Sequence, residues 1–216
     1  DDGVLRFQQG LSRFYVPQEP LFEAAATVFE AASEGAAEAR ELRERLEQLA
    51  PGQAGSLWVG TFHAVCARLL RAYATQIGIR KDFVIYDDSD QKSMLTRVIN
   101  GMDLDDRVFP PKQVAYRINA AKQEGKSPDA MEAHDSFERT VREIYAEYEQ
   151  RMAASSALDF GDLIYRLVRE LDQRPDMRAA LKARFSHVLV DEFQDVNHVQ
   201  FAFVQTLCED HRNLCV

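Results

Sequence analysis

The chain has 216 residues, enough for one large domain or two small ones, and its 46% hydrophobic content is ordinary for a protein that buries a core. No run approaches the ~18 apolar residues of a membrane span, so we expect no membrane protein. Lys and Arg total 26 against 35 Asp and Glu, a formal net charge of −9. This charge disfavours autonomous nucleic-acid binding, because phosphate affinity comes from Lys and Arg. Any DNA contact must be local or shared with another segment.

The three cysteines are Cys66, Cys208 and Cys215, and they form neither a C-x-x-C pair nor a metal-ligand spacing with histidines. We therefore expect reduced thiols in a cytoplasmic protein. The first residue is Asp1 rather than Met, no signal-peptide layout follows, and residues 214–216 resemble the start of a strand. These features predict a fragment of a longer protein.

The first half of the chain predicts mostly helices. Residues 1–20 show no period, residues 23–49 are rich in Ala, Glu and Arg and predict a helix, and the Pro and Gly of residues 51–55 break it. Residues 57–59 predict a short strand. An amphipathic helix then runs from Phe62 to a stop at Gly78.

Further helices follow. Asp88 with Gln91 is typical of a capping box for a helix that ends near Gly101. The next helix opens at Pro110-Pro111 and closes at Gly125, and a third starts at Phe137. The segment 158–163 is interpreted as another helix start, with Phe160 in the core and Asp159 or Asp162 as a cap. Helices from Pro175 and over 198–208 flank a strand at 187–190, and 213–216 begins a strand.

The most informative segment is His187 to Asp195. An apolar run ends in Asp191 and Glu192, and Asp195 follows four residues after the first acid. Buried parallel strands are continuous Val/Ile/Leu runs, and α/β proteins place their chemistry beyond the carboxyl ends of such strands. Acids there need a cation, of which Mg²⁺ is the usual one. The pattern favours a nucleotide-hydrolase motif over a strand that ends in solvated acids.

A second segment, residues 120–127 (A-A-K-Q-E-G-K-S), fits a relaxed phosphate-loop expression. A phosphate loop needs a preceding strand, several glycines, and a helix that starts at Lys-Ser. Here a helix leads into the segment, Gly125 is its one glycine, and Pro128 follows directly. We interpret the segment as a helix end followed by a solvated loop.

Four segments, in order, resemble superfamily 1 DNA helicases of the UvrD/Rep/PcrA type. They are W-V-G-T-F-H at 58–63, F-V-I-Y-D at 83–87 with Pro110-Pro111 further on, A-L-D-F-G-D-L at 157–163, and V-L-V-D-E-F-Q-D-V-N at 188–197. The last is similar to the family's motif II. The resemblance covers about residues 56–216. It implies a helix-dominated α/β fold, namely a partial P-loop NTPase (RecA-like) domain with a helical 1B-type insertion.

The resemblance also implies roles. Asp191 would hold Mg²⁺, and Glu192 would polarise the attacking water, as the catalytic pair. Gln194 and Asp195 would couple the ATP site to DNA-contacting segments. Thr61, Phe62 and His63 would approach single-stranded DNA. Phe62 fits a core position equally well, and His63 fits a hydrogen-bonding partner at a helix start.

The implied domains are a divergent N-terminal segment with one helix (1–50), the first part of the 1A domain (51–78), a 1B-like subdomain (79–157), and the second part of 1A (158–216). A glycine-rich Walker A loop is not found before residue 58, and the family's Q-S-I-Y segment and second motor domain are not in this sequence. We therefore expect this polypeptide alone neither to hydrolyse ATP usefully nor to unwind DNA.

Three functions stay open. The first is a piece of an ATP-dependent DNA helicase, monomeric, moving 3′ to 5′ on single-stranded or duplex DNA in repair or replication. The second is a non-enzymatic remnant that binds DNA or repair proteins through the 1B-like helices. The third is a carboxylate-metal nuclease that uses Asp191, Glu192 and Asp195.

Overall fold

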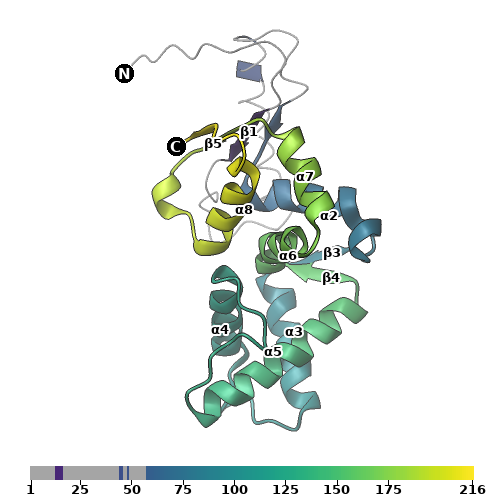
Figure 1. The fold of residues 1–216 in the computed structure, drawn as a ribbon. Helices are drawn as coiled ribbons and strands as arrows, with labels where there is room; N and C mark the ends of the chain where they lie inside the picture. The colour runs from purple at the N-terminus through teal and green to yellow at the C-terminus, as the bar shows by residue number, and fades with distance from the viewer. Residues whose placement is uncertain (1–12, 17–43, 46–47, 49–56) are drawn as a thin grey trace. The chain divides into compact units, whose positions relative to one another are not determined.

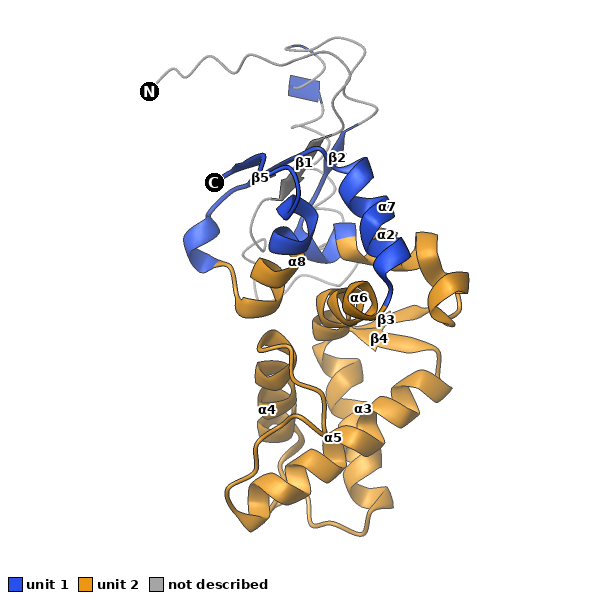
Figure 2. Ribbon diagram, in the orientation of Figure 1, with its two compact units in different colours: residues 1–65, 174–195, 204–216 blue, residues 66–173, 196–203 orange. Residues whose placement is uncertain are grey.

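The computed structural model describes residues 13–16, 44–45, 48 and 57–216, and it forms two compact units (Figure 1). Unit 1 comprises the described parts of residues 1–65, 174–195 and 204–216, and unit 2 comprises residues 66–173 and 196–203 (Figure 2). The predicted helix over 23–49 lies outside the described residues except at 44, 45 and 48, which are helical. The break predicted at 51–55 lies outside them entirely.

Unit 1 contains a four-stranded parallel sheet in the order β2-β1-β5-β6. Its strands are β1 (Arg13–Val16), β2 (Trp58–Val59), β5 (His187–Val190) and β6 (Leu214–Cys215). The sequence predicted β2, β5 and β6 and missed β1. Four residues are too short for a period to appear, and only pairing identifies them as a strand: Phe14 lies opposite both Trp58 and Val188.

Helix α7 (Pro175–Arg184) leads into β5, and an aromatic pair secures that connection. The rings of Trp58 and Phe185 meet edge to face at a centroid distance of 5.3 Å, and the Arg184 guanidinium lies 4.7 Å from the Trp58 ring centroid. Phe185 is fully buried. The start of α7 at Pro175 agrees with the sequence, since proline is favoured in the first helical turn.

Two helices contain residues of both units. Helix α2 (Phe62–Ile77) follows β2, and α8 (His198–Cys208) follows β5. Gly78, with φ +71°, ends α2 as predicted, because a left-handed residue closes a helix without a steric penalty only when it is glycine.

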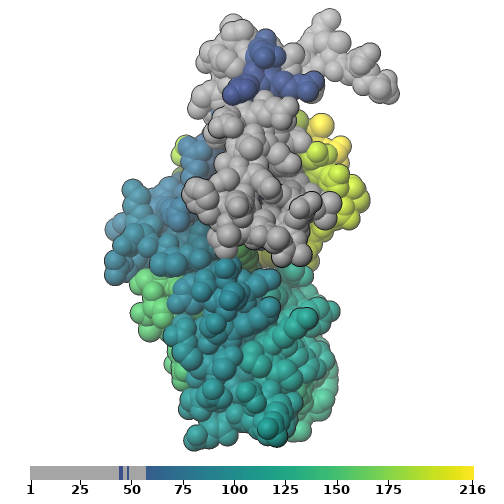
Figure 3. Space-filling model, turned by 180° about the vertical axis from the view of Figure 1, so that it is seen from behind, coloured from purple at the N-terminus to yellow at the C-terminus, as the bar shows by residue number. Residues whose placement is uncertain are grey.

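Besides its parts of α2 and α8, unit 2 contains two short parallel strands and four complete helices. The strands are β3 (Val84–Tyr86) and β4 (Ala157–Asp159), and the helices are α3 (Asp88–Gly101), α4 (Pro111–Gln123), α5 (Ser136–Ala154) and α6 (Phe160–Gln173). Figure 3 shows the packed side chains of this unit from behind, in teal and green. Its core consists of apolar side chains from α3, α4 and α5, among them Leu95, Val98, Ile99, Val114, Ile118, Ile144, Tyr145 and Tyr148.

Three details of unit 2 differ from the sequence prediction. Asp87, not Asp88, caps α3, and its box partner is Asp90 rather than Gln91. Helix α6 begins at Phe160 because residues 157–159 are taken up in pairing with β3. Phe160 is 38% exposed and is not a core residue.

The helix-dominated α/β class predicted from the sequence is confirmed, with parallel strands in both units. None of the described helices combines the length and apolar character that crossing a membrane requires.

Candidate functional site

The acids singled out in the sequence lie at the tip of β5. Val188 and Val190 are 0% and 3% exposed, whereas Asp191 and Glu192 follow directly and are exposed. The strand thus runs through the core and delivers two carboxylates to solvent at its carboxyl end. In open α/β sheets this is the edge where ligands bind.

The backbone of Glu192 has an unusual conformation. Its φ is +50°, in the left-handed region that residues with a Cβ adopt at a cost of about 1–2 kcal/mol. Two hydrogen bonds hold it there: the Glu192 N–H donates to Asp191 Oδ1 at 2.9 Å, and the Asp195 N–H donates to the Glu192 carbonyl at 3.0 Å. Such strained residues cluster at functional sites, and nothing in the sequence signalled this one.

The residues predicted to contact DNA, Thr61, Phe62 and His63, follow β2. Because β2 and β5 are parallel members of one sheet, their carboxyl ends lie at the same edge, with β1 between them. The residues that follow β1 lie outside the described ones. The shared edge therefore carries Thr61 after one strand and the Asp191–Glu192 pair after another.

Thr61, Phe62 and His63 differ in their local structure. Thr61 Oγ1 accepts the Ala64 N–H at 3.2 Å and caps α2. Phe62 is 3% exposed, so in this structure its ring belongs to the core and is not open to a stacking base. His63 is partly exposed.

Gln194 and Asp195 are exposed in a short 3-10 turn, η2 (Phe193–Asp195), immediately before α8. The last residue of the motif, Asn197, directly precedes α8. Its Oδ1 accepts the Gln200 N–H at 3.0 Å, and Gln200 Oε1 accepts the Asn197 N–H at 2.9 Å. This reciprocal cap gives the asparagine of the motif a local structural role.

The donor chemistry at the tip of β5 fits Mg²⁺. This ion keeps several waters and takes one or two protein carboxylates together with phosphate oxygens, so an exposed Asp191 suffices on the protein side. A nuclease would need a larger cluster. Within the described residues no group of three or more His, Cys, Asp or Glu side chains could hold a metal, and Asp191, Glu192 and Asp195 form none. The nuclease alternative therefore lacks geometric support.

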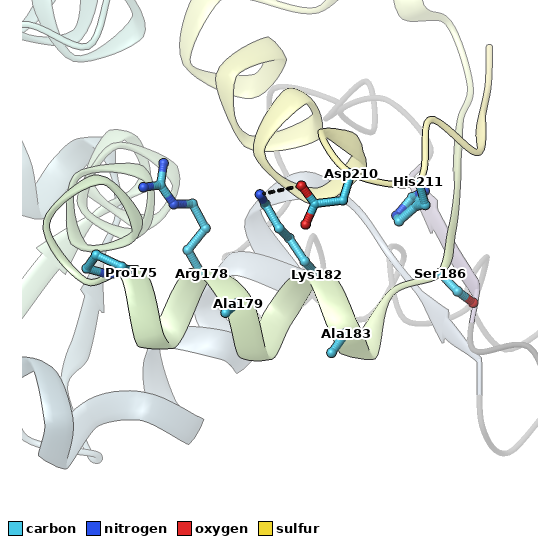
Figure 4. Close-up of a pocket in the computed structure, with 8 residues that line it drawn as sticks. All are labelled: Pro175, Arg178, Ala179, Lys182, Ala183, Ser186, Asp210 and His211. Atoms are coloured by element: carbon cyan, nitrogen blue, oxygen red, sulfur yellow. Dashed lines mark hydrogen bonds and ion pairs between the residues drawn. The ribbon is translucent and has the colours of Figure 1, made fainter.

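A cavity of 420 Å³ also lies in unit 1, against α7 (Figure 4). It borders Ser186, which precedes β5, and so lies toward the amino end of that strand rather than at the acidic tip. Lys182 in its wall is paired with Glu209 at 2.6 Å and Asp210 at 3.1 Å, which neutralises its charge. We assign this cavity no catalytic role.

The phosphate-loop lookalike at 120–127 has the structure expected of a helix end. Helix α4 runs into it as far as Gln123, and Gly125 has φ +74°. The Lys126 ammonium lies 2.8 Å from Glu124, and a turn rather than a helix follows Ser127. The rejection of this segment as a phosphate loop is confirmed.

The sequence matches the UvrD/REP helicase N-terminal domain over residues 34–216. Among curated proteins it is 37% identical over 180 residues to "ATP-dependent DNA helicase PcrA" of Staphylococcus aureus (strain NCTC 8325 / PS 47), covering 82% of this chain and 25% of that protein. It is 34% identical over 180 residues to the protein of the same name in Bacillus subtilis (strain 168), with 82% and 24% covered.

A third relative, "DNA helicase II" of Salmonella typhimurium, is 36% identical over 173 residues, which cover 80% of this chain and 24% of that protein. The chain thus spans about a quarter of the length of these curated relatives.

Proposed function

This chain belongs to the UvrD/REP helicase family, and from that membership we propose that it is part of the first motor domain of an ATP-dependent DNA helicase. Unit 1 is then a portion of a RecA-like domain, and the helices over 79–157 are its 1B-type insertion. The single observation that carries the proposal is the pair Asp191–Glu192 at the carboxyl end of a parallel strand, with Glu192 in the left-handed region.

The proposed roles follow from position. Asp191 would hold Mg²⁺, and Glu192 would orient and polarise the water that attacks the γ-phosphate. When bound, the ion neutralises charge on the phosphates. Phosphoryl transfer depends mostly on positioning and electrostatics, so a strained backbone that aims one carboxylate suits this chemistry.

The residues flanking this pair complete the proposed machinery. Gln194 and Asp195 couple ATP hydrolysis to DNA-contacting segments. Thr61 and His63 lie near single-stranded DNA, with buried Phe62 fixing the start of α2. Movement is 3′ to 5′, and the intact protein acts as a cytoplasmic monomer in DNA repair or replication.

The decisive variant is Glu192→Gln in the full-length protein. Removing a positioned general base typically costs 10²- to 10⁴-fold, so we expect DNA-stimulated ATPase activity to fall at least ~100-fold while single-stranded DNA binding persists. Glu143→Gln, an exposed acid on α5, serves as the control and should leave both unchanged. An ATPase rate within a few-fold of the parent would remove Glu192 from the proposed role.

We expect the 216-residue chain on its own not to hydrolyse ATP at a useful rate, because it spans only about a quarter of the length of the helicases that it matches. A DNA-stimulated ATPase activity measured on this chain, and lost on Glu192→Gln, would contradict that expectation.

A non-enzymatic DNA-binding role is the second candidate, and α4 favours it. This helix contains no acidic residue in a chain of net charge −9. Its solvent face presents Tyr116, 72% exposed, one turn from exposed Lys112 and next to exposed Arg117, whose Nη1 lies 3.5 Å from Glu138 Oε1 in a partly exposed ion pair. Cations that contact phosphates beside an aromatic ring that stacks a base are the usual elements of sequence-independent binding.

The test is a double charge reversal, Lys112→Glu with Arg117→Glu, in the chain described. If α4 binds DNA, anisotropy with a labelled oligonucleotide should show weaker binding and a salt dependence whose slope falls by roughly 2. The matched control reverses the charge of two other exposed residues of unit 2, Arg80 and Lys81. Equal binding by both double variants would exclude α4 as the contact surface.

A further inference from the structure

Unit 2 buries a lysine among carboxylates. Lys122 of α4 is 0% exposed, and its ammonium lies 2.9 Å from Asp159 Oδ2 and 2.5 Å from Asp162 Oδ1. These two aspartates are 3% and 4% exposed. Gly161 leaves room for the lysine stem, because a Cβ there would lie 3.1 Å from Lys122 Cδ.

Helix α5 completes the surroundings of this lysine. Glu149 approaches the ammonium at 3.0 Å in an ion-pair geometry and is 29% exposed. The rings of Tyr145 and Tyr148 lie with centroids 5.7 and 5.2 Å from the ammonium. We call Lys122, Tyr148, Glu149, Asp159 and Asp162 the Lys122 cluster.

Asp159 is held as the ionised member. Its Oδ2 accepts hydrogen bonds from Gln91 Nε2 at 2.9 Å, Lys122 Nζ at 2.9 Å and the Tyr148 hydroxyl at 2.8 Å. Its Oδ1 accepts the Asp162 N–H at 2.8 Å. Burial acts to raise the pKa of Asp159, but the charge and hydrogen bond of Lys122 outweigh it and hold the pKa below its ordinary value.

Asp162 has fewer donors. Its Oδ2 accepts the Asp159 N–H at 3.0 Å, and it shares Lys122 with Asp159. One ammonium cannot neutralise two fully buried carboxylates, and an uncompensated buried charge is costly. Burial first, and then repulsion from the Asp159 carboxylate, raise the pKa of Asp162 well above its ordinary value. Of the two aspartates, Asp162 is therefore the one whose pKa is raised, and Asp159 the one whose pKa is lowered.

We propose that the Lys122 cluster is a proton-linked clamp, which holds α4 and α5 against β4 and α6 while Asp162 keeps its proton and loosens when that proton leaves. Five elements of unit 2, namely α3, α4, α5, β4 and α6, contribute groups. They are Gln91 of α3, Asn119 and Lys122 of α4, Tyr145, Tyr148 and Glu149 of α5, Asp159 of β4, and Asp162 and Tyr165 of α6.

The direction of the pH dependence follows from these shifts. The Asp162 contribution is fully present below the unfolded value of about 3.9 and is lost as pH rises through the folded pKa. The Asp159 contribution is present above about 3.9 and stays constant at higher pH. Burial acts to lower the pKa of Lys122, but the carboxylates outweigh it and raise the pKa, so its contribution persists below about 10.4.

As pH rises above about 3.9, the shift that couples proton loss to opening of the cluster is therefore the raised pKa of Asp162. Linkage to a single proton makes the equilibrium constant for local opening rise by at most about tenfold per pH unit.

Hydrogen-exchange mass spectrometry on the chain tests the clamp. After correction for intrinsic exchange, peptides that cover α4 and β4 should open progressively more as pH rises from about 3.9 to the raised folded pKa of Asp162, and level off above it. Asp162→Asn, which imitates the protonated side chain, should open little and show no such rise. Asp172→Asn, an exposed aspartate of the same helix, is the matched control and should behave like the parent.

Two results would overturn the clamp. One is an equal rise with pH in the parent and in Asp162→Asn, which would assign the effect to other groups. The other is greater opening of Asp162→Asn at every pH, which would show that Asp162 works in its ionised form. A carboxyl ¹³C titration of the unmutated chain decides independently of any variant: Asp162 should titrate above the ordinary aspartate value of about 3.9, and a midpoint at or below that value refutes the proposal.

Discussion

Replacing Lys122 by Met tests how strongly the buried cation stabilises unit 2. Methionine retains most of the aliphatic volume, so the main effect is a carboxylate left without its cation. Removing one partner of a buried ion pair costs about 3–5 kcal/mol. Asp159 keeps its hydrogen bonds from Gln91 and Tyr148, so we expect the lower end, about 3 kcal/mol of unfolding free energy at neutral pH. The loss should shrink in acid, where Asp159 becomes protonated.

Urea unfolding followed by far-ultraviolet circular dichroism measures this loss, because unit 2 is mostly helical. Fluorescence of Trp58, the single tryptophan, reports on unit 1 in the same samples. Lys126→Met provides the control. Its side chain is 37% exposed and paired with exposed Glu124, so the free energy of unfolding of this variant should stay close to that of the parent.

A second variant tests whether the loss comes from the Asp159 carboxylate that is left without its cation. Adding Asp159→Asn to Lys122→Met removes the unpaired carboxylate and preserves a good helix cap for α6, so the double variant should recover part of the stability. A loss below about 1 kcal/mol for Lys122→Met, or a double variant no more stable than the single one, would refute the reasoning.

Two further predictions concern unit 1 and the thiols. Phe185→Ala should destabilise unit 1 by about 3–5 kcal/mol because the ring is fully buried against Trp58; an unchanged midpoint in Trp58 fluorescence would contradict this. A thiol reagent at neutral pH should modify exposed Cys215 first, because burial raises the pKa of the Cys66 thiol and raises that of Cys208 to about 11. Mass spectrometry measures the rate of modification at each cysteine. Equal rates at all three would show that Cys66 and Cys208 are not buried.

The sequence alone predicted most features that depend on neighbours along the chain. Helix starts at Phe62 and Pro175, helix stops at Gly78 and Gly125, and the acids that end β5 all follow from periods, caps and turn residues a few positions apart. The ordered motifs also predicted the family, which the match over residues 34–216 confirms.

Tertiary structure decided what depends on distant partners. β1 and β4 are too short to show a period and exist because other strands pair with them. The sequence suggested Asp159 or Asp162 as a helix cap within a family-like segment, and placed Lys122 at the end of a helix that leads into the rejected phosphate loop. Lys122 and Asp159 are 37 positions apart in the chain, and no local pattern predicts that their side chains are in contact. Whether a charged side chain is solvated or buried beside its counter-charge is set by the packing of whole elements, and this decides which of two neighbouring aspartates keeps a proton.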